Sequence, residues 1–195
     1  MKKKKIILAS SSEYRKSIFS SLKLDFICIS PNINETPLDN EKPEELAIRL
    51  SIEKAKKIAK NEKNSIIIGS DACACCEGRI LGKPLSKEKA IIFLRYMSNK
   101  TVEFYTGICV INSSTNEIKT DISKYMIKIK KLNDKSILEY IDKYKPFNSS
   151  AAFRYEVAKE ILIKEFIDNE NDISGLIGLP LKKLIPILKY YSVLR

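Results

Sequence analysis

The fold follows from one stretch near the N-terminus, KIILASSSEYRKSIFSSLKL (residues 5–24). Residues 5–9 are rich in β-formers, and the three serines that follow can cap the N-terminus of a helix. After the serines, apolar side chains recur at helical spacing at Tyr14, Ile18, Phe19 and Leu22. We therefore expect a strand, a polar turn and a helix over Glu13–Leu24, an arrangement that points backbone N–H groups at a bound anion.

The rest of the chain alternates strand-like and helix-like segments. Helices are expected at residues 44–60, 86–97, 133–144 and 181–191, and Pro186 should kink or shorten the last one. Strands are expected at residues 26–29, 65–70, 102–112, 117–131 and 160–167, with a hairpin over 72–81, whereas residues 147–158 fit neither pattern. This mixture predicts an α/β fold with a mixed, elongated β-sheet flanked by helices, in a single domain over residues 1–195.

Composition excludes several functions. The 195-residue chain has a formal charge of +11 and no histidine, which rules out Ser-His-Asp and Cys-His catalysis and leaves acid–base work to carboxylates, lysines, tyrosines or water. The lysines are spread over every segment, and neither an arginine-rich helix nor an RNA-binding aromatic signature is present. The sequence therefore argues against nucleic acid as a partner, and a small polyanion such as a triphosphate suits the charge equally well.

Hydropathy and cysteine usage bear on location. The apolar stretch after the N-terminal lysines is four residues long, too short for a signal-peptide core, and no apolar run reaches the length of a membrane span. We expect a cytoplasmic protein with no membrane partner. Five cysteines stand at positions 28, 73, 75, 76 and 109, without zinc-ligand spacing, so we expect small buried apolar residues in a reducing compartment.

Three short blocks could carry chemistry, although each also has an ordinary structural explanation. Ser10-Ser11-Ser12 with Arg15-Lys16 places hydroxyls and cations at a strand-to-helix turn, which suits an anion or a simple helix cap. Asp71 follows an apolar strand, where α/β sheets bind ligands and where turn aspartates also occur. Gly82-Lys83-Pro84 holds a lysine in a narrow turn.

Taken in order, these blocks and several others resemble the Maf family of nucleotide pyrophosphatases, and the resemblance covers nearly the whole chain. The matching motifs are Ile7–Ser12 with Arg15-Lys16, Asn34-Glu35-Thr36, Glu53-Lys54-Ala55, Ile68-Gly69-Ser70-Asp71, Gly78 with Leu81-Gly82-Lys83-Pro84, Phe104-Tyr105-Thr106-Gly107 and Gly178-Leu179-Pro180-Leu181. The resemblance implies an ITPase-like fold and hydrolysis of a nucleoside triphosphate to its monophosphate and pyrophosphate. It also implies a homodimer.

The resemblance further implies roles for particular residues. Asp71 matches the catalytic aspartate that activates water, and Glu35 matches an acidic residue that helps to hold a divalent metal together with Asp71. Mg²⁺ is the expected ion, with Mn²⁺ as an alternative, because oxygen ligands and phosphates suit both. The positions implied to surround the triphosphate are Ser10, Arg15, Lys16, Lys54 and Lys83.

Within the family, the branch assigned to 7-methyl-GTP is the most similar, and its specificity positions fall on Tyr14, Ala72 and Glu156. Stacking on Tyr14 and the negative charge of Glu156 would suit a cationic methylated guanine. Without the family, Tyr14 would be interpreted as a core residue of its helix and Glu156 as an exposed carboxylate. The chain departs from the family at Glu13, where proline is usual, at Ala151 and Val157, where glycine is expected, and at Ala72, which replaces a polar residue.

Two other functions stay open at this point. One is a pyrophosphatase of broader specificity, acting on dTTP, UTP or other modified nucleotides. The other is a non-enzymatic regulator linked to cell division or nucleic acid, for which the +11 charge is the sequence support. The presence of Glu35, Asp71 and Lys83 favours the enzyme, since a pure binder would not need them.

Overall fold

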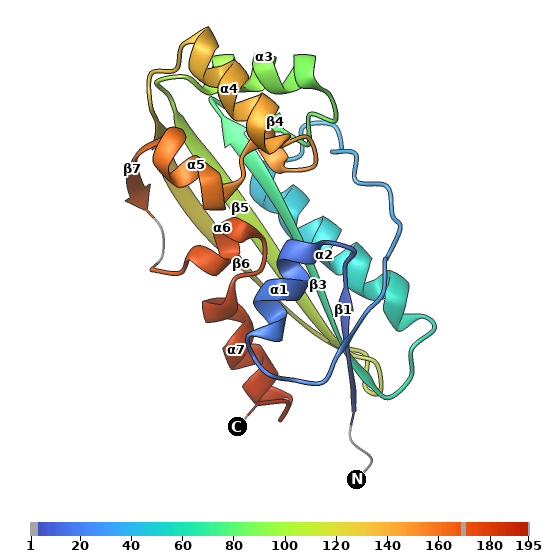
Figure 1. The fold of residues 1–195 in the computed structure, drawn as a ribbon. Helices are drawn as coiled ribbons and strands as arrows, with labels where there is room; N and C mark the ends of the chain where they lie inside the picture. The colour runs from blue at the N-terminus through green and yellow to red at the C-terminus, as the bar shows by residue number, and fades with distance from the viewer. Residues whose placement is uncertain (1–3, 169–170, 195) are drawn as a thin grey trace. The chain divides into compact units, whose positions relative to one another are not determined.

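The structure is a computed structural model that describes residues 4–168 and 171–194 (Figure 1). Its strands are β1 (Lys5–Ala9), β2 (Ile27–Cys28), β3 (Ser65–Cys76), β4 (Arg79–Leu81), β5 (Thr101–Asn112), β6 (Glu117–Ile129) and β7 (Ile163–Asp168). Its helices are α1 (Glu13–Ser20), α2 (Pro43–Ala59), α3 (Lys87–Met97), α4 (Asp134–Tyr144), α5 (Tyr155–Ile161), α6 (Ile173–Ile177) and α7 (Leu181–Tyr190), with a 3₁₀ turn η1 (Ser150–Ala152).

The strands form one mixed sheet in the order β2-β1-β3-β5-β6-β7, and β4 pairs with β3. Strand β1 runs parallel to both β2 and β3, whereas β4 is antiparallel to β3 and β7 is antiparallel to β6. A sheet with both kinds of pairing, flanked by helices, confirms the predicted mixed α/β class.

The chain forms two compact units. One contains residues up to Ala72, Thr106–Ser123 and the residues from Asp172 onward, and the other contains Cys73–Tyr105 and Lys124–Asn171. Strands β3, β5 and β6 contribute residues to both units. The expectation of a single domain over residues 1–195 stays a prediction.

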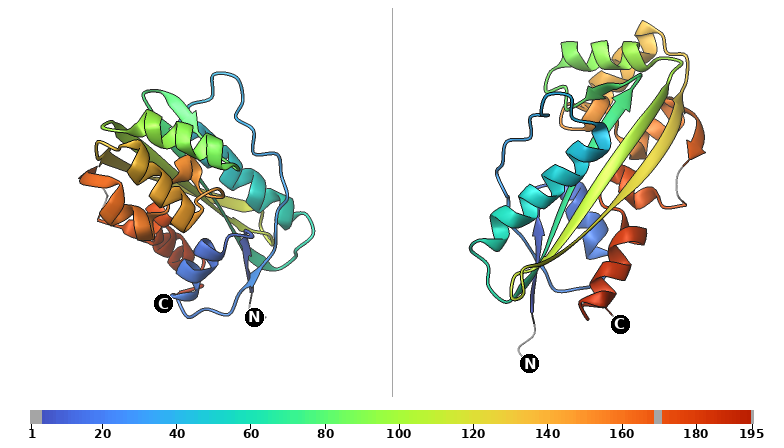
Figure 2. Two further views of the ribbon diagram at one scale, coloured as in Figure 1. Left: turned by 45° about the horizontal axis from the view of Figure 1, so that its top comes forward. Right: turned by 180° about the vertical axis from the view of Figure 1, so that it is seen from behind.

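In the first unit, alternation along the strands separates two apolar faces. One face packs against α1 and α7 and contains Ile6, Leu8, Ile66, Ile68, Ile108 and Val110, with Phe19, Leu184 and Leu188 from the helices. The other face packs against α2 and contains Ile7, Ala9, Ile67, Cys109 and Ile111, with Ala55 and Ile58 from the helix. Figures 1 and 2 show α1 and α7 on one side of these strands and α2 on the other. In this part of β3, even-numbered residues therefore face α1 and α7, and odd-numbered residues face α2.

Two glycines let α2 approach the sheet closely. A Cβ atom added to Gly69 of β3 would lie 2.2 Å from the carbonyl oxygen of Ser51, and one added to Gly107 of β5 would lie 2.5 Å from that of Ala47. No other residue type fits at this spacing without moving the helix. The glycines thus fix the position of α2, and of the side chains it carries, over β3 and β5.

In the second unit, Tyr140 of α4 orders the chain after Pro146. Its buried hydroxyl donates to the carbonyl of Ala152 at 3.0 Å and accepts from the N–H of Arg154 at 3.1 Å. The N–H of Ala151 donates to the carbonyl of Gly82 at 2.9 Å, which joins this segment to the turn that carries Lys83. These partners lie far apart in sequence, which explains why residues 147–158 fitted no local pattern.

Several expected boundaries differ from the structure. Strand β3 does not end at Ser70 but continues to Cys76, because residues 74–76 pair with β4 and are buried. Helix α1 ends at Ser20 rather than near Leu24, since the backbone at Lys23 has a φ of 53° and cannot continue a helix. Pro186 lies inside α7 and does not cut it short. Among the described residues, no helix is both long and apolar enough to cross a membrane.

Candidate active site

Two acidic side chains meet at one buried cation in the first unit. The ammonium of Lys54 donates a hydrogen bond to Oδ1 of Asp71, and the same nitrogen lies 2.7 Å from Oε1 of Glu35. The side chain of Lys54 is 5% exposed, that of Asp71 11% and that of Glu35 41%. The structure therefore brings Glu35, Lys54 and Asp71 together, with the most exposed of the three coming from a loop.

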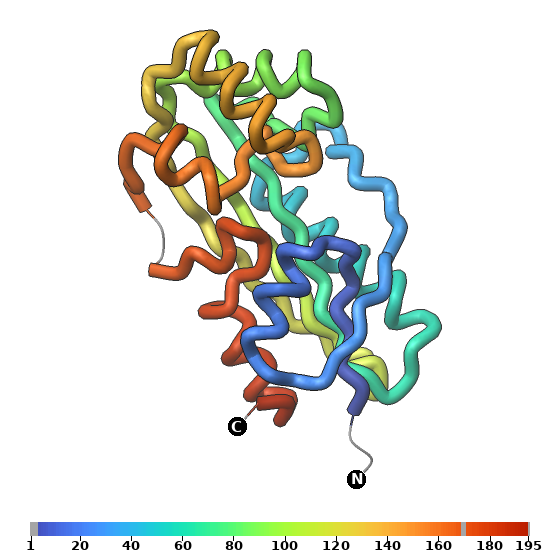
Figure 3. Tube along the Cα trace, viewed as in Figure 1, coloured from blue at the N-terminus to red at the C-terminus, as the bar shows by residue number. Residues whose placement is uncertain are grey.

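The three residues reach this place from different elements. Asp71 shares its face of β3 with Ile67 and Gly69, the face that packs against α2. Lys54 lies on the buried side of α2, next to Ala55. Ala55 packs against Gly69, and its Cβ would lie 3.0 Å from a Cβ added to that glycine. Glu35 belongs to the long connection between β2 and α2, drawn in light blue in Figure 3. The site therefore depends on the close approach of α2 that the glycines permit.

Asp71 lies in the interior of a strand, which corrects the expectation that it ends one. Strand β1 pairs with β3 as far as Gly69, and β4 pairs with it from Ala74 onward. Asp71 thus stands beyond the carboxyl end of its parallel neighbour β1, while its own strand continues. Polar groups that follow the end of a parallel strand are well placed for a ligand.

On the opposite face of β3, Arg15 and Ser70 share one backbone acceptor. Nε of Arg15 donates to the carbonyl of Gly178 at 2.8 Å, and the hydroxyl of Ser70 lies 2.9 Å from the same oxygen. The Ser70 hydroxyl also lies 2.9 Å from the carbonyl of Gly107, and its single proton can serve one acceptor at a time. These contacts hold the N-terminal helix, β3 and the segment before α7 together.

The serine turn after β1 caps α1 as expected. Ser12 is the N-cap residue, and its hydroxyl accepts from the N–H of Arg15 at 3.4 Å. The hydroxyl of Ser10, a residue that is 5% exposed, accepts from the N–H of Ser12 at 3.1 Å. Because Ala9 pairs with Gly69, this turn begins beside Ser70 along the sheet.

The remaining predicted residues of the first unit are less confined. Lys16 is exposed, with its ammonium 3.8 Å from Oε2 of Glu13. Tyr14 is 39% exposed, so the alternative interpretation of Tyr14 as a core residue is wrong. Ala72 is partly buried and follows Asp71 directly.

Lys83 and Glu156 belong to the second unit. Lys83 is exposed in the turn whose Gly82 carbonyl accepts from Ala151. Glu156 is exposed in the first turn of α5. The structure thus links the turn of Lys83 to the segment that leads into α5.

Sequence reasoning missed Arg49, which lies five residues before Lys54 on α2. Its guanidinium contacts Glu41 through two nitrogens, at 2.6 and 2.8 Å, and contacts Glu53 at 3.1 Å. The hydrogen bonds from Arg49 hold the pKa of Glu41 below its ordinary value. The spacing of Arg49 and Glu53 by four residues was a local signal for that pair, whereas nothing local pointed to Glu41.

The donor set of the site fits a hard divalent cation. The described residues contain no group of three or more His, Cys, Asp or Glu side chains arranged to hold a metal. Glu35 and Asp71 nevertheless converge on a single cationic nitrogen, so their oxygens already face a position of positive charge. One or two carboxylates, completed by water and substrate phosphates, are what Mg²⁺ usually takes from a protein.

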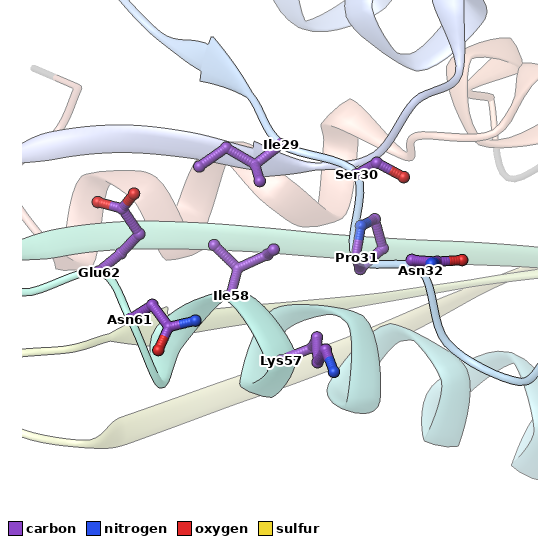
Figure 4. Close-up of a pocket in the computed structure, with 8 residues that line it drawn as sticks. All are labelled: Ile29, Ser30, Pro31, Asn32, Lys57, Ile58, Asn61 and Glu62. Carbon is purple, nitrogen blue, oxygen red and sulfur yellow. The ribbon is translucent and has the colours of Figure 1, made fainter.

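A separate hollow lies on the α2 side of the first unit, and none of the predicted site residues lines it. The segment after β2 supplies Ile29 and Pro31 to its wall, and the end of α2 and the residues after it supply Lys57, Ile58 and Asn61 (Figure 4).

Comparison with known proteins identifies the family. The model of the Maf-like protein family matches residues 5–191, so the chain belongs to that family.

Curated relatives carry a more specific name. A 7-methyl-GTP pyrophosphatase of Colwellia psychrerythraea is 37% identical over 190 residues, which cover 97% of this chain and 94% of that protein. A 7-methyl-GTP pyrophosphatase of Aliivibrio fischeri is 40% identical over 185 residues, 95% of each chain. A solved structure of a nucleoside-triphosphatase described as a dITP/XTP pyrophosphatase, from Mycobacterium abscessus, aligns with a TM-score of 0.41 and 14% identity over 66% of this chain and 75% of that one.

Proposed function

We propose that this protein hydrolyses 7-methyl-GTP to 7-methyl-GMP and pyrophosphate and so removes a modified nucleotide from the pool. Membership of the Maf-like family and near full-length similarity to proteins named 7-methyl-GTP pyrophosphatase support the proposal. The observation that carries it in the structure is the meeting of Glu35 and Asp71 at Lys54.

The chemistry requires a base, a place for a cation and neutralisation of the leaving group. Asp71 takes a proton from the water that attacks the α-phosphorus, as the bond from that phosphorus to the bridging oxygen breaks and pyrophosphate leaves. Lys54 stays beside Asp71 and orients the carboxylate through their hydrogen bond. Ser10, Arg15, Lys16 and Lys83 are the residues that we assign to the phosphates, where hydroxyls and cations offset the charge that accumulates on the leaving group.

Glu35 and Asp71 are the residues that would hold a divalent metal, Mg²⁺ or alternatively Mn²⁺. Such an ion supplies positive charge to the phosphate oxygens when it is bound. Because Lys54 already lies between the two carboxylates, part of its contact with them would be exchanged for the ion.

The base would be recognised by Tyr14 and Glu156. Tyr14 exposes an aromatic ring on α1, and a ring face attracts a cationic methylated guanine by about 0.5 to 2 kcal/mol. Glu156 offers an exposed carboxylate that accepts from the N–H groups of guanine. At Ala72, Ala151 and Val157 the chain departs from the pattern of the family, and these departures favour broader specificity as the second candidate.

A cytoplasmic location and a homodimer belong to the same proposal. All five cysteines are free thiols, as suits a reducing compartment. Light scattering at micromolar concentration tests the dimer.

The test is pyrophosphate release from 7-methyl-GTP, GTP, dTTP and UTP in the presence of Mg²⁺. We expect the highest kcat/KM on 7-methyl-GTP. Comparable rates on dTTP and UTP would establish the broader enzyme instead. Absence of release from every nucleotide, together with tight binding to a polymer, would replace the enzyme with the regulator.

Asp71→Asn gives the first mutational prediction. We expect kcat to fall by at least about 100-fold, because the amide cannot accept the proton from water. The fold should be retained, since Lys54 keeps Glu35 as a partner and the amide occupies the same space. Steady-state pyrophosphate release and circular dichroism check the two parts, and Lys5→Gln, which removes an exposed ion pair with Glu62, serves as control. An active Asp71→Asn enzyme would end the assignment.

A further inference from the structure

Arg49 connects α2 to the loop that carries Glu35. Its Nη2 donates to the carbonyl of Thr36, the residue after Glu35, at 3.2 Å. Its Nε and Nη2 donate to the two carboxylate oxygens of Glu41 at 2.6 and 2.8 Å, a bidentate pair. One guanidinium therefore holds the loop at two points, five residues apart.

The loop segment from Asn34 to Glu41 is also bonded within itself. The N–H and hydroxyl of Thr36 donate to Oδ1 of Asn34 at 3.0 and 2.7 Å, on either side of Glu35. The N–H of Leu38 donates to Oε2 of Glu41 at 3.0 Å. A displacement of Arg49 would therefore move the backbone around Glu35, because these hydrogen bonds connect the two.

Burial makes the contact between Arg49 and Glu41 more than a surface ion pair. The side chain of Glu41 is 6% exposed and that of Arg49 is 22% exposed. Exposed ion pairs contribute little, whereas a buried carboxylate needs its partner. On its other side Arg49 contacts Glu53, the residue before Lys54, at 3.1 Å.

We propose that Arg49 is a positioning residue that holds Glu35 at Lys54 and Asp71 by fixing the segment Asn34–Glu41 to α2, and that it thereby sets the affinity of the site for a divalent cation. The inference rests on the proposed function for the role of Glu35. Arg49 touches none of the atoms that react in the proposed hydrolysis. It acts on Glu35, which is the most exposed of the three side chains and belongs to a loop. Glu35 therefore has the greatest conformational freedom for Arg49 to restrict.

The experiment compares wild type with Arg49→Lys and Glu41→Gln, using Mn²⁺ as the probe. Lysine keeps the charge but lacks the planar fork that reaches Thr36 and Glu41 together. Glutamine keeps the shape of Glu41 but removes its charge. Mn²⁺ binding to the free protein is measured by electron paramagnetic resonance, without substrate. We expect the dissociation constant to rise by about 10-fold or more in both variants, the usual scale for losing a residue that orients a metal ligand.

Two further measurements separate positioning from general damage. At saturating metal, kcat should stay within about 3-fold of wild type while the metal concentration for half-activation rises by about 10-fold, since Glu35 is displaced and not removed. Backbone hydrogen exchange should quicken in the segment Asn34–Glu41 and stay unchanged in β3. The matched control is Arg95→Lys, which alters an exposed arginine–carboxylate pair with Asp134 and should leave every readout unchanged.

The outcomes are distinct. If wild type binds Mn²⁺ and both variants bind it equally well, the positioning role is wrong and the proposed function stands. If wild type hydrolyses the nucleotide without any metal, the metal part of the proposed function is wrong and this inference falls with it. A variant that binds weakly only because it has unfolded would show loss of circular dichroism, and Glu41→Gln, the milder change, then decides the question.

Discussion

Ala151 and Ala152 adopt a backbone conformation that glycine tolerates best. Both have a φ of 55°, in the left-handed region, and position 151 is one at which the family resemblance predicted a glycine. The structure keeps the left-handed turn even though the glycine is absent. Side chains with a Cβ are strained there by roughly 1 to 2 kcal/mol per residue.

Ala151→Gly should therefore stabilise the protein. We expect a gain of about 1 kcal/mol in the free energy of unfolding, because relief of the strain exceeds the extra freedom of glycine in the unfolded chain. Urea denaturation measures the change. Ala158→Gly, within α5, is the control and should destabilise by about 1 kcal/mol or more. A less stable Ala151→Gly protein would contradict the prediction.

The pair of Arg49 and Glu41 predicts a dependence of stability on pH. Hydrogen bonds from Arg49 lower the pKa of Glu41 from its ordinary value of 4.5. Because the folded pKa lies below the unfolded one, the contribution is fully present above about pH 4.5 and is lost as the pH falls through the folded pKa. The stability difference between wild type and Glu41→Gln should be constant from pH 6 to 8 and shrink in acid, as urea denaturation at each pH can show. A difference that grows in acid would refute it.

The sequence could name the candidate site residues but not their contacts. The family resemblance picked out Glu35, Lys54 and Asp71, and the structure places them together. Lys54 was assigned to phosphate, whereas in the structure it bonds to both acids. That arrangement depends on the packing of α2 over β3, which no local pattern encodes. The contact between the Ser70 hydroxyl and the carbonyl of Gly178 was missed for the same reason, since 108 residues separate them.

At the scale of elements, the contact of α2 with β3 decides whether the site forms. Gly69→Ala would place a methyl group 2.2 Å from the backbone of α2. We expect a loss of about 3 kcal/mol in stability, and reduced activity because Lys54 moves with the helix. Gly82→Ala is the matched control, since nothing lies within 4 Å of its added Cβ, and it should change stability by less than about 0.5 kcal/mol. Thermal and urea unfolding check both variants. Equal stabilities of the Gly69→Ala and Gly82→Ala proteins would show that α2 can move away from β3 at little cost in free energy.

Elements with strong periodicity were predicted well. The ranges expected for β1, α3, β5 and α4 agree with the structure to within a residue, because apolar spacing and capping residues mark them clearly. The short helix α6 and the turn η1 were not anticipated. They are held by distant partners, such as the hydroxyl of Thr106, which donates to the carbonyl of Gly175 at 2.8 Å.

At the scale of the whole molecule, net charge gives a prediction that no single residue carries. A formal charge of +11 attracts a triphosphate over a distance set by the ionic strength. We expect kcat/KM to fall several-fold between roughly 0.05 and 0.5 M NaCl, with kcat changing less, because salt screens the approach more than the chemistry. Sucrose at matched osmolality is the control. A kcat/KM that is constant across the salt series would show that the charge plays no part in substrate capture.

The shared acceptor at Gly178 has a consequence for biosynthesis. Arg15 leaves the ribosome 163 residues ahead of the carbonyl that orients it. Until that late segment emerges, the growing chain has both acids and Lys54 but cannot complete the anchoring of its first helix. Translation that stops before this point yields a polypeptide that contains Glu35, Lys54 and Asp71 but in which Arg15 lacks its backbone acceptor.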